Sequence, residues 1–104
     1  MTPLTVYVAG PISGITDFLE RFQEGQMEVA SLGHLPVNPL EVCKKLVGGH
    51  HTWLDFMRAD IRALLECDGI YCLRDWHQSR GARIEHFIAE NLGMVVLYQP
   101  EKEN

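Results

Sequence analysis

Apolar residues follow two alternating patterns along the chain. Short apolar runs rich in β-branched and aromatic side chains, such as LTVYVA, stop at glycine or proline and predict buried strands. Longer segments with apolar residues every three or four positions predict amphipathic helices. The predicted strands are residues 4–9, 34–37, 69–73 and 94–98. The predicted helices are a segment that follows Thr16 or Asp17 and ends at Gly33, a short helix at 40–46, and helices at 53–66 and 81–92.

This order of elements predicts the fold class. Strands that are apolar throughout and alternate with helices favour a parallel sheet covered on both faces and built from right-handed crossovers. We therefore expect an α/β fold, a small doubly wound, flavodoxin-like sheet of about four to five strands with helices on both faces. Ligands of such sheets bind beyond the carboxyl ends of the strands, where the strand order reverses. The stretches GPISGITD, NPLEV and RDWHQSRGARIE leave strands at that edge.

Composition narrows the classes of function. A chain of 104 residues that is 46% hydrophobic and 22% charged predicts one globular domain over residues 1–104. Its net charge of -5 argues against a nucleic acid polymer as partner but leaves room for a small anionic ligand. No apolar run approaches the roughly 20 residues that span a bilayer, so no membrane partner is expected. Cys43, Cys67 and Cys72 form an odd set without a CxxC pair, and no leader is evident, so we expect reduced thiols and a cytoplasmic protein.

Two loops are candidates for binding an anion. AGPISG at residues 9–14 follows a strand, and its glycines and Ser13 allow close backbone approach and offer donors, although a tight turn explains the same residues. It matches neither the dinucleotide fingerprint nor the ATPase phosphate loop. SRGA at residues 79–82 begins the last predicted helix, where free N–H groups favour an anion. Ser79 is either a phosphate ligand or a helix cap.

Two carboxylates are candidates for chemistry. Glu85 lies about one turn into the last helix and faces either solvent or the strand ends. Asp60 lies in the amphipathic helix at 53–66, where membership of a charged face is the alternative explanation. The histidines lack the spacing of a metal site, so we expect no metal. No cofactor is expected either.

Four motifs occur in order over nearly the whole chain: VYVAGPISG, VNP, WLDFMRADIRALLECDGIYCL and WHQSRGARIE. With this series the sequence resembles the nucleoside 2-deoxyribosyltransferase-like superfamily. It is most similar to a short, uncharacterised bacterial and phage branch, DUF4406-like, with the pattern Y-x-A-G-P-I-[ST]-G, N-P, D-I and S-x-G-A-x-x-E.

The resemblance implies cleavage of an N-glycosidic bond by a glutamate nucleophile, and the motif assigns that role to Glu85. We expect the helix end and nearby donors to hold this carboxylate ionised. Tyr7 matches a tyrosine that orients the nucleophile, although a core tyrosine fits equally. Asp60 matches an aspartate that contacts the base or protonates it, a role that needs a raised pKa.

The resemblance also implies the substrate class. Enzymes acting on free nucleosides carry an aspartate six residues before the nucleophile, whereas those acting on 5′-monophosphates carry a serine, here Ser79. Either Arg80 or Arg83 adds positive charge for the phosphate, or both are simply solvated. The base pocket is lined by Trp53, Trp76 and the NPLEV segment, or the tryptophans lie in the core or at an interface instead. The substrate-binding residues implied are Gly10, Pro11, Ser13, Gly14, Asn38, Ser79, Gly81 and Ala82.

The leading hypothesis is therefore an N-glycosidase that hydrolyses (deoxy)nucleoside 5′-monophosphates. One alternative is a 2-deoxyribosyltransferase that exchanges bases between nucleosides. The other is a non-catalytic module that binds or sequesters a nucleotide on the same scaffold. The resemblance implies a homodimer or a higher homo-oligomer in each case.

Overall fold

The chain forms a four-stranded sheet with helices on both faces. A computed structural model describes residues 2–46 and 48–102. The elements in chain order are β1 (Thr5–Ala9), α1 (Phe18–Ser31), β2 (Leu35–Val37), α2 (Pro39–Cys43), α3 (Trp53–Leu65), β3 (Gly69–Cys72), the 3₁₀ helix η1 (Trp76–Gln78), α4 (Arg80–Asn91) and β4 (Val95–Tyr98). Every predicted strand and helix is present. The short helix predicted at 40–46 starts one residue earlier and ends at Cys43, and η1 lies in a segment expected to be a loop.

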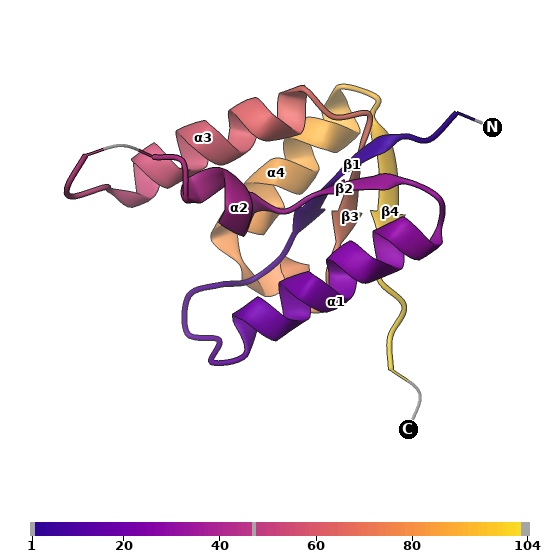
Figure 1. The fold of residues 1–104 in the computed structure, drawn as a ribbon, viewed down its shortest axis with the longest axis horizontal. Coiled ribbons are helices and arrows are strands. Elements are labelled where there is room, and N and C mark those ends of the chain that lie inside the picture. Colours follow the sequence, from indigo (N-terminus) through magenta and orange to yellow (C-terminus); the bar gives the residue numbers. More distant parts are fainter. Residues whose placement is uncertain (1, 47, 103–104) are drawn as a thin grey trace.

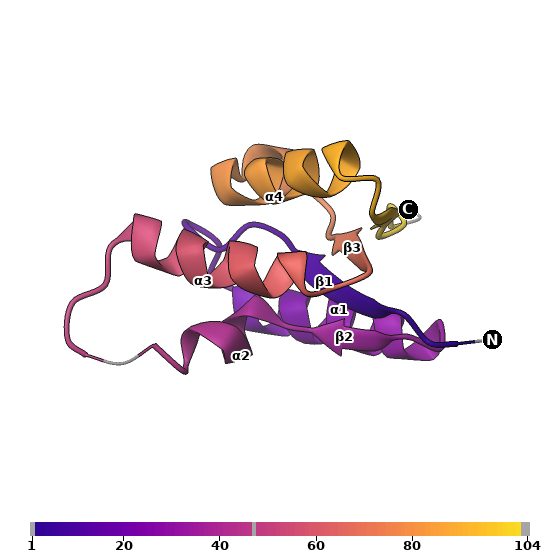
Figure 2. The ribbon, with the colours of Figure 1, turned by 90° about the horizontal axis from the view of Figure 1, so that it is seen from above.

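The strand order explains how the helices are distributed. All neighbouring strands are parallel, in the order β2-β1-β3-β4. The chain moves from β1 to β2 in one direction and returns past β1 to β3 and β4 in the other. Because such crossovers are right-handed, α1 covers one face of the sheet while α3 and α4 cover the opposite face (Figure 1). Seen from above, α2 and α4 lie at opposite sides of the molecule, with α3 between them (Figure 2). The doubly wound α/β prediction is confirmed, with four strands.

Each face of the sheet has its own hydrophobic cluster. Alternate residues of β1 point to opposite faces, so Tyr7 and Ala9 join the cluster under α3 and α4, while Val6 and Val8 join the cluster under α1. Burial on both faces explains why the strands read as continuous apolar runs. It also places the Tyr7 side chain on the face where α4 lies.

Local signals fix where the helices begin. Thr52 and Asp55 form a capping box at the start of α3, and Ser79 Oγ accepts from the backbone N–H of Ala82 at the start of α4, at 3.2 Å. Asp17 stands at the N-cap of α1 without a capping bond and pairs instead with Arg21 at 2.9 Å. The caps of α3 and α4 anchor the two helix starts that border the site described below.

Two further expectations concern membranes and thiols. No helix in residues 2–46 and 48–102 combines the length and the apolar character needed to cross a bilayer. Cys43, Cys67 and Cys72 are all free thiols, and Cys72 is buried in β3. Cys67 packs against the same hydrophobic cluster as Cys72, as expected for small apolar side chains.

The centre of the sheet is also where the strand order reverses. β1 and β3 are adjacent, yet the connections that leave them run to opposite sides, so their carboxyl ends border a crevice. The backbone of Gly10 packs closely against the Leu73 side chain there, because a Cβ on Gly10 would lie 2.7 Å from Leu73 Cδ1. Glycine at position 10 therefore lets the loop after β1 pass over the end of β3.

Candidate active site

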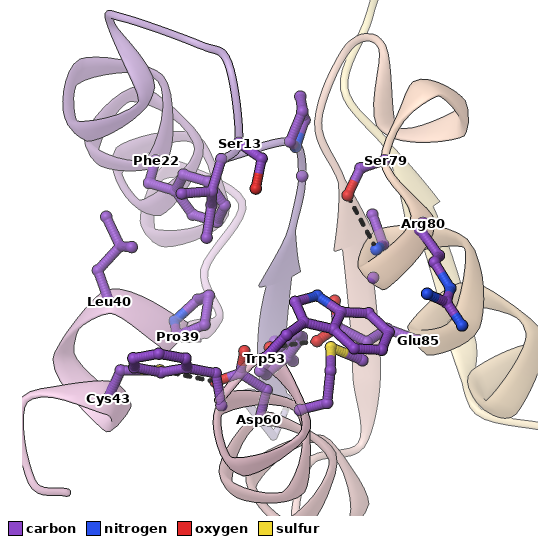
Figure 3. A pocket seen from close by; sticks show the side chains of 18 of the residues that line it. Ser13, Phe22, Pro39, Leu40, Cys43, Trp53, Asp60, Ser79, Arg80 and Glu85 are labelled. Atoms are coloured by element: carbon purple, nitrogen blue, oxygen red, sulfur yellow. Dashed lines mark hydrogen bonds between the residues drawn. The ribbon is translucent and has the colours of Figure 1, made fainter. Parts of the chain in front are cut away.

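A cavity of about 560 Å³ lies at the carboxyl ends of β1 and β3. This volume is in the ordinary range of small-molecule sites, roughly 300–1,000 Å³. Its walls come from β1 and the loop that follows it, from α1, α2 and α3, and from η1 with the first turns of α4 (Figure 3). Apolar side chains make up much of the lining, among them Phe22, Leu40, Trp53, Phe56 and Met57.

Most of the residues predicted from the sequence meet in this cavity. Nine of the eleven line it: Tyr7, Gly10, Pro11, Ser13, Asp60, Ser79, Gly81, Ala82 and Glu85. They come from β1 and its following loop, from α3 and from the start of α4, which are far apart in the sequence. The switch point of the sheet brings them together.

Gly14 and Asn38 are not among the lining residues. Gly14 has φ +77°, a left-handed conformation that favours glycine, so its role is in the turn after Ser13. Asn38 caps α2: its Oδ1 accepts from the N–H of Leu40 at 2.9 Å, and its amide donates to Gln26 Oε1 at 3.1 Å. The structure thus gives Asn38 a local role that the N-P motif alone did not reveal, while Pro39 and Leu40 beside it do line the cavity.

Tyr7 and Glu85 form a buried hydrogen-bonded pair. The Tyr7 hydroxyl donates to Glu85 Oε2 at 2.7 Å, across 78 residues of sequence. Burial, the charge of Glu85 and the bond itself raise the pKa of Tyr7 well above its usual value, so the hydroxyl stays protonated as a donor. Tyr7 is therefore both a core side chain and the group that orients the glutamate.

Burial controls the protonation of Glu85. The residue is 5% exposed, and desolvation raises its pKa from 4.5 to about 8, with the charge of Asp60 acting in the same direction and the bond from Tyr7 acting against it. This corrects the expectation that the helix end holds Glu85 ionised. Glu85 is the sixth residue of α4, and the effect of a helix end falls off within about the first turn.

Asp60 is the second carboxylate of the cavity. It is buried in α3, and desolvation raises its pKa from 3.8 to about 6, as an acid role requires. The thiol of Cys43, at the end of α2, donates to Asp60 Oδ1 at 3.2 Å, and this bond lowers the pKa of Asp60. Asp60 shares a helix face with Trp53 and Met57, at the spacing that points all three into the cavity.

Each carboxylate keeps one oxygen open to the cavity. Glu85 Oε1 and Asp60 Oδ2 have no hydrogen bond to another described residue. Neither oxygen is fully buried, because His51 Nε2 is the one buried side-chain nitrogen or oxygen without a partner in the described part of the chain. The two free oxygens are consequently accessible to a ligand. Each carboxylate is thus held by a donor at one oxygen and presents its other oxygen to the cavity.

Positive character gathers at another part of the cavity. The Arg80 guanidinium lies 4.5 Å from the centre of the Trp53 ring, and neither a carboxylate nor another acceptor pairs with it among the described residues. The backbone N–H groups of Arg80 and Gly81 begin α4 without a hydrogen-bond partner in the same set. Figure 3 shows Ser13 and Ser79 toward one end of the view and Asp60 and Glu85 toward the other, with Trp53 and Arg80 alongside. The cavity therefore suits a ligand with an anionic group near the start of α4.

Several cavity residues were not identified from the sequence. Cys43 directly follows the NPLEV segment and lies one helical turn beyond Leu40, and that three-residue spacing was a usable signal. Gln78 lies in η1, where no periodic pattern exists. Trp76 does not line the cavity but stacks on His86 at 4.1 Å, on the side of α4 near Tyr98. Both Arg80 and Arg83 are exposed, but Arg80 lines the cavity and Arg83 does not.

The donor set of the cavity favours acid–base and nucleophilic chemistry. Among residues 2–46 and 48–102, no group of three or more His, Cys, Asp or Glu side chains is placed to hold a metal ion. The groups that carry protons or charge are two carboxylates with unequal environments, one tyrosine, one thiol and one arginine. Two carboxyl groups with different pKa values are the usual equipment for cleaving a glycosidic bond.

Two solved structures with the same fold are 2-deoxyribosyltransferases. One, from Bacillus psychrosaccharolyticus, has a TM-score of 0.69 and 19% identity, and the match covers 96% of this chain and 77% of that chain. Another, from Leishmania mexicana, has a TM-score of 0.64 and 21% identity, and the match covers 92% of this chain and 63% of that chain. No curated protein matches the sequence. The resemblance inferred from the motifs is thus confirmed at the level of the fold.

A family model identifies the chain more narrowly than the fold does. The chain belongs to the family described as Domain of unknown function (DUF4406), whose model matches residues 4–98. The match includes both carboxylates, Tyr7 and the start of α4. It agrees with the uncharacterised branch that the ordered motifs indicated.

Proposed function

We propose that the protein is an N-glycosidase that hydrolyses (deoxy)nucleoside 5′-monophosphates, with Glu85 as nucleophile. The observation that carries the proposal is the pair of buried carboxylates at the switch point of the sheet, each held by one donor and open at its other oxygen. The fold shared with 2-deoxyribosyltransferases supports the same class of chemistry.

The reaction proceeds in two balanced steps. Glu85 Oε1 attacks the anomeric carbon of the sugar, and the bond from that carbon to the base nitrogen breaks with its electron pair going to the base. Asp60 gives its proton to the departing base, which leaves neutral, and a glycosyl ester of Glu85 remains. Asp60, now a carboxylate, takes a proton from water; the hydroxide attacks the anomeric carbon and releases Glu85. The products are the free base and the sugar 5-phosphate.

Substrate binding must favour the transfer of one proton from Glu85 to Asp60. Near pH 7 the pKa of Glu85, about 8, keeps its proton in place, while Asp60, with a pKa of about 6, is ionised. The reactive form has the proton on Asp60 instead, and because the pKa of Glu85 lies above that of Asp60, it is the minor form of this singly protonated pair. A base nitrogen that accepts from Asp60, and a sugar that gains positive charge beside Glu85, both favour the reactive form.

The groups at the start of α4 are suited to bind the 5′-phosphate of the substrate. The unpaired N–H groups of Arg80 and Gly81 and the Arg80 guanidinium offer donors and positive charge to an anion. Ser79 Oγ already accepts from Ala82, and its hydroxyl hydrogen is left to donate. Trp53 offers an aromatic surface for the base or for closing over the ligand.

A base-release experiment tests the proposal. The purified protein is incubated with each common deoxynucleoside 5′-monophosphate and its 5-hydroxymethyl analogue, where one exists, and free base is measured by chromatography. The wild type should release base, and Glu85→Gln should not while still binding the nucleotide. Glu90→Gln, an exposed change on the same helix, is the matched control and should behave like the wild type. Full activity of Glu85→Gln would overturn the assignment of the nucleophile.

The fold relatives favour one further candidate function, base exchange. A second free base would then replace water in the second step, so the test is repeated with a deoxynucleoside and a labelled acceptor base. Incorporation of the label would identify a transferase. If neither reaction occurs and the nucleotide is recovered intact from a tight complex, the chain is a nucleotide-binding module.

We further propose a homo-oligomer in the cytoplasm. Large apolar side chains on the outer surface support an interface between copies, including Phe87 at 65% and Leu92 at 62% exposure. Free thiols and a nucleotide substrate are consistent with a reducing compartment. Sedimentation equilibrium tests the oligomer, and a monomer at all concentrations would refute it.

A further inference from the structure

We propose that Cys43 is the positioning residue of the acid: its thiol holds one oxygen of Asp60 and thereby aims the other oxygen at the departing base. This inference rests on the proposed function, because it assigns Cys43 a part in the step that Asp60 performs.

The geometry supports this role. Cys43 Sγ lies 3.2 Å from Asp60 Oδ1, and both residues line the cavity, although they come from different helices, α2 and α3 (Figure 3). Asp60 has no other hydrogen-bond partner among the described residues, so the thiol is the contact that fixes its carboxyl plane. Glu85 is held in the same manner by Tyr7. Since α2 and α3 pack together, the Cys43–Asp60 contact also ties the short helix to the acid.

A thiol has properties that suit an acid. Burial and the contact with Asp60 raise the pKa of Cys43 to about 12, so the thiol remains protonated and can donate at neutral pH. An S–H group is a weak donor, and it stabilises an ionised carboxylate less than a hydroxyl would. Asp60 is thus oriented while its pKa stays raised. A serine in this place would hold the carboxylate more strongly in its ionised form.

Carboxyl titration tests the pair without turnover. The carbon-13 chemical shift of the Asp60 carboxyl group, assigned with Asp60→Asn, is followed against pH in the wild type, Cys43→Ser and Cys43→Ala. We expect the pKa of Asp60 to be highest in Cys43→Ala and lowest in Cys43→Ser, with steps of about 0.5–1 on each side of the wild type. Cys67→Ala removes a thiol outside the cavity and should leave the titration unchanged. Identical titration of Asp60 in the wild type and both Cys43 variants would overturn the inference.

Kinetics then test positioning. We expect Cys43→Ala to lower kcat about tenfold with KM unchanged, and Cys43→Ser to restore most of kcat with the acid limb of the pH profile shifted to lower pH. A kcat unaffected by Cys43→Ala in an active protein would also overturn the inference. Absence of base release by the wild type would count against the proposed function alone. In that case a shifted titration still supports the holding of Asp60 by Cys43, and an unshifted one refutes it.

Discussion

Replacing Glu85 with glutamine should stabilise the protein, and the gain should depend on pH. Folding removes the Glu85 carboxyl group from water, which raises its pKa from 4.5 to about 8. Between these two pH values the folded state holds more protons than the unfolded state, so the free energy of unfolding falls as the pH rises. Glutamine has no proton to lose and can still accept from Tyr7 through its amide oxygen.

The size of the effect follows from the same pKa values. Each tenfold change in proton affinity corresponds to about 1.4 kcal/mol, so the buried carboxylate costs about 4–5 kcal/mol once the pH exceeds both values. This is a large share of the roughly 5–15 kcal/mol that stabilises a typical domain. Glu85→Gln should match the wild type near pH 4.5 and exceed it by several kcal/mol above pH 8.

Urea unfolding followed by circular dichroism at several pH values measures the difference. Glu90→Gln removes a carboxylate from the exposed side of the same helix and controls for net charge. The reasoning fails if the advantage of Glu85→Gln is the same at acidic and alkaline pH, or if Glu90→Gln shows an equal gain. Loss of activity together with higher stability would identify Glu85 as a group retained for chemistry rather than for folding.

Three other outcomes are expected. The pH profile of kcat/KM should be a bell with limbs near pH 6 and 8, set by Asp60 and Glu85, and a flat profile over this range would contradict the carboxylate pair. Arg80→Gln should raise KM for monophosphates about tenfold and leave KM for nucleosides unchanged. Arg83→Gln removes the same charge outside the cavity, and equal effects of the two changes would show that only net charge matters. Gly25→Ala should lower the free energy of unfolding by about 1–3 kcal/mol, because the new Cβ would lie 2.5 Å from Leu73 Cδ2. A higher free energy of unfolding in urea would refute this expectation.

The fold could be predicted from the sequence because its signals are local and repeated. Apolar runs that end at Gly10, and the capping residues Thr52 and Ser79, mark element boundaries that the structure reproduces closely. η1 could not be predicted, since three residues carry no period. It follows Asp75, which adopts φ +65° although it is not a glycine.

Most of the predicted site residues line the cavity, but their protonation could not be predicted. Motif order indicated Tyr7, Asp60 and Glu85, and all three line one cavity. Burial depends on the packing of distant segments, so sequence position suggested an ionised Glu85 where the structure gives it a raised pKa. The contact of Cys43 with Asp60 was hidden for the same reason, because it depends on how α2 packs against α3.

The hydrogen bonds of the site also divide the chain in two. Both donors, Tyr7 and Cys43, precede the exposed loop that contains residues 48–50, and both acceptors, Asp60 and Glu85, follow it. A chain cut in this loop would yield one fragment with β1, β2 and the donors, and one with β3, β4 and the carboxylates. The two fragments would reunite mainly through the pairing of β1 with β3. Base release could then serve as a split-protein reporter, since neither fragment alone holds an oriented carboxylate.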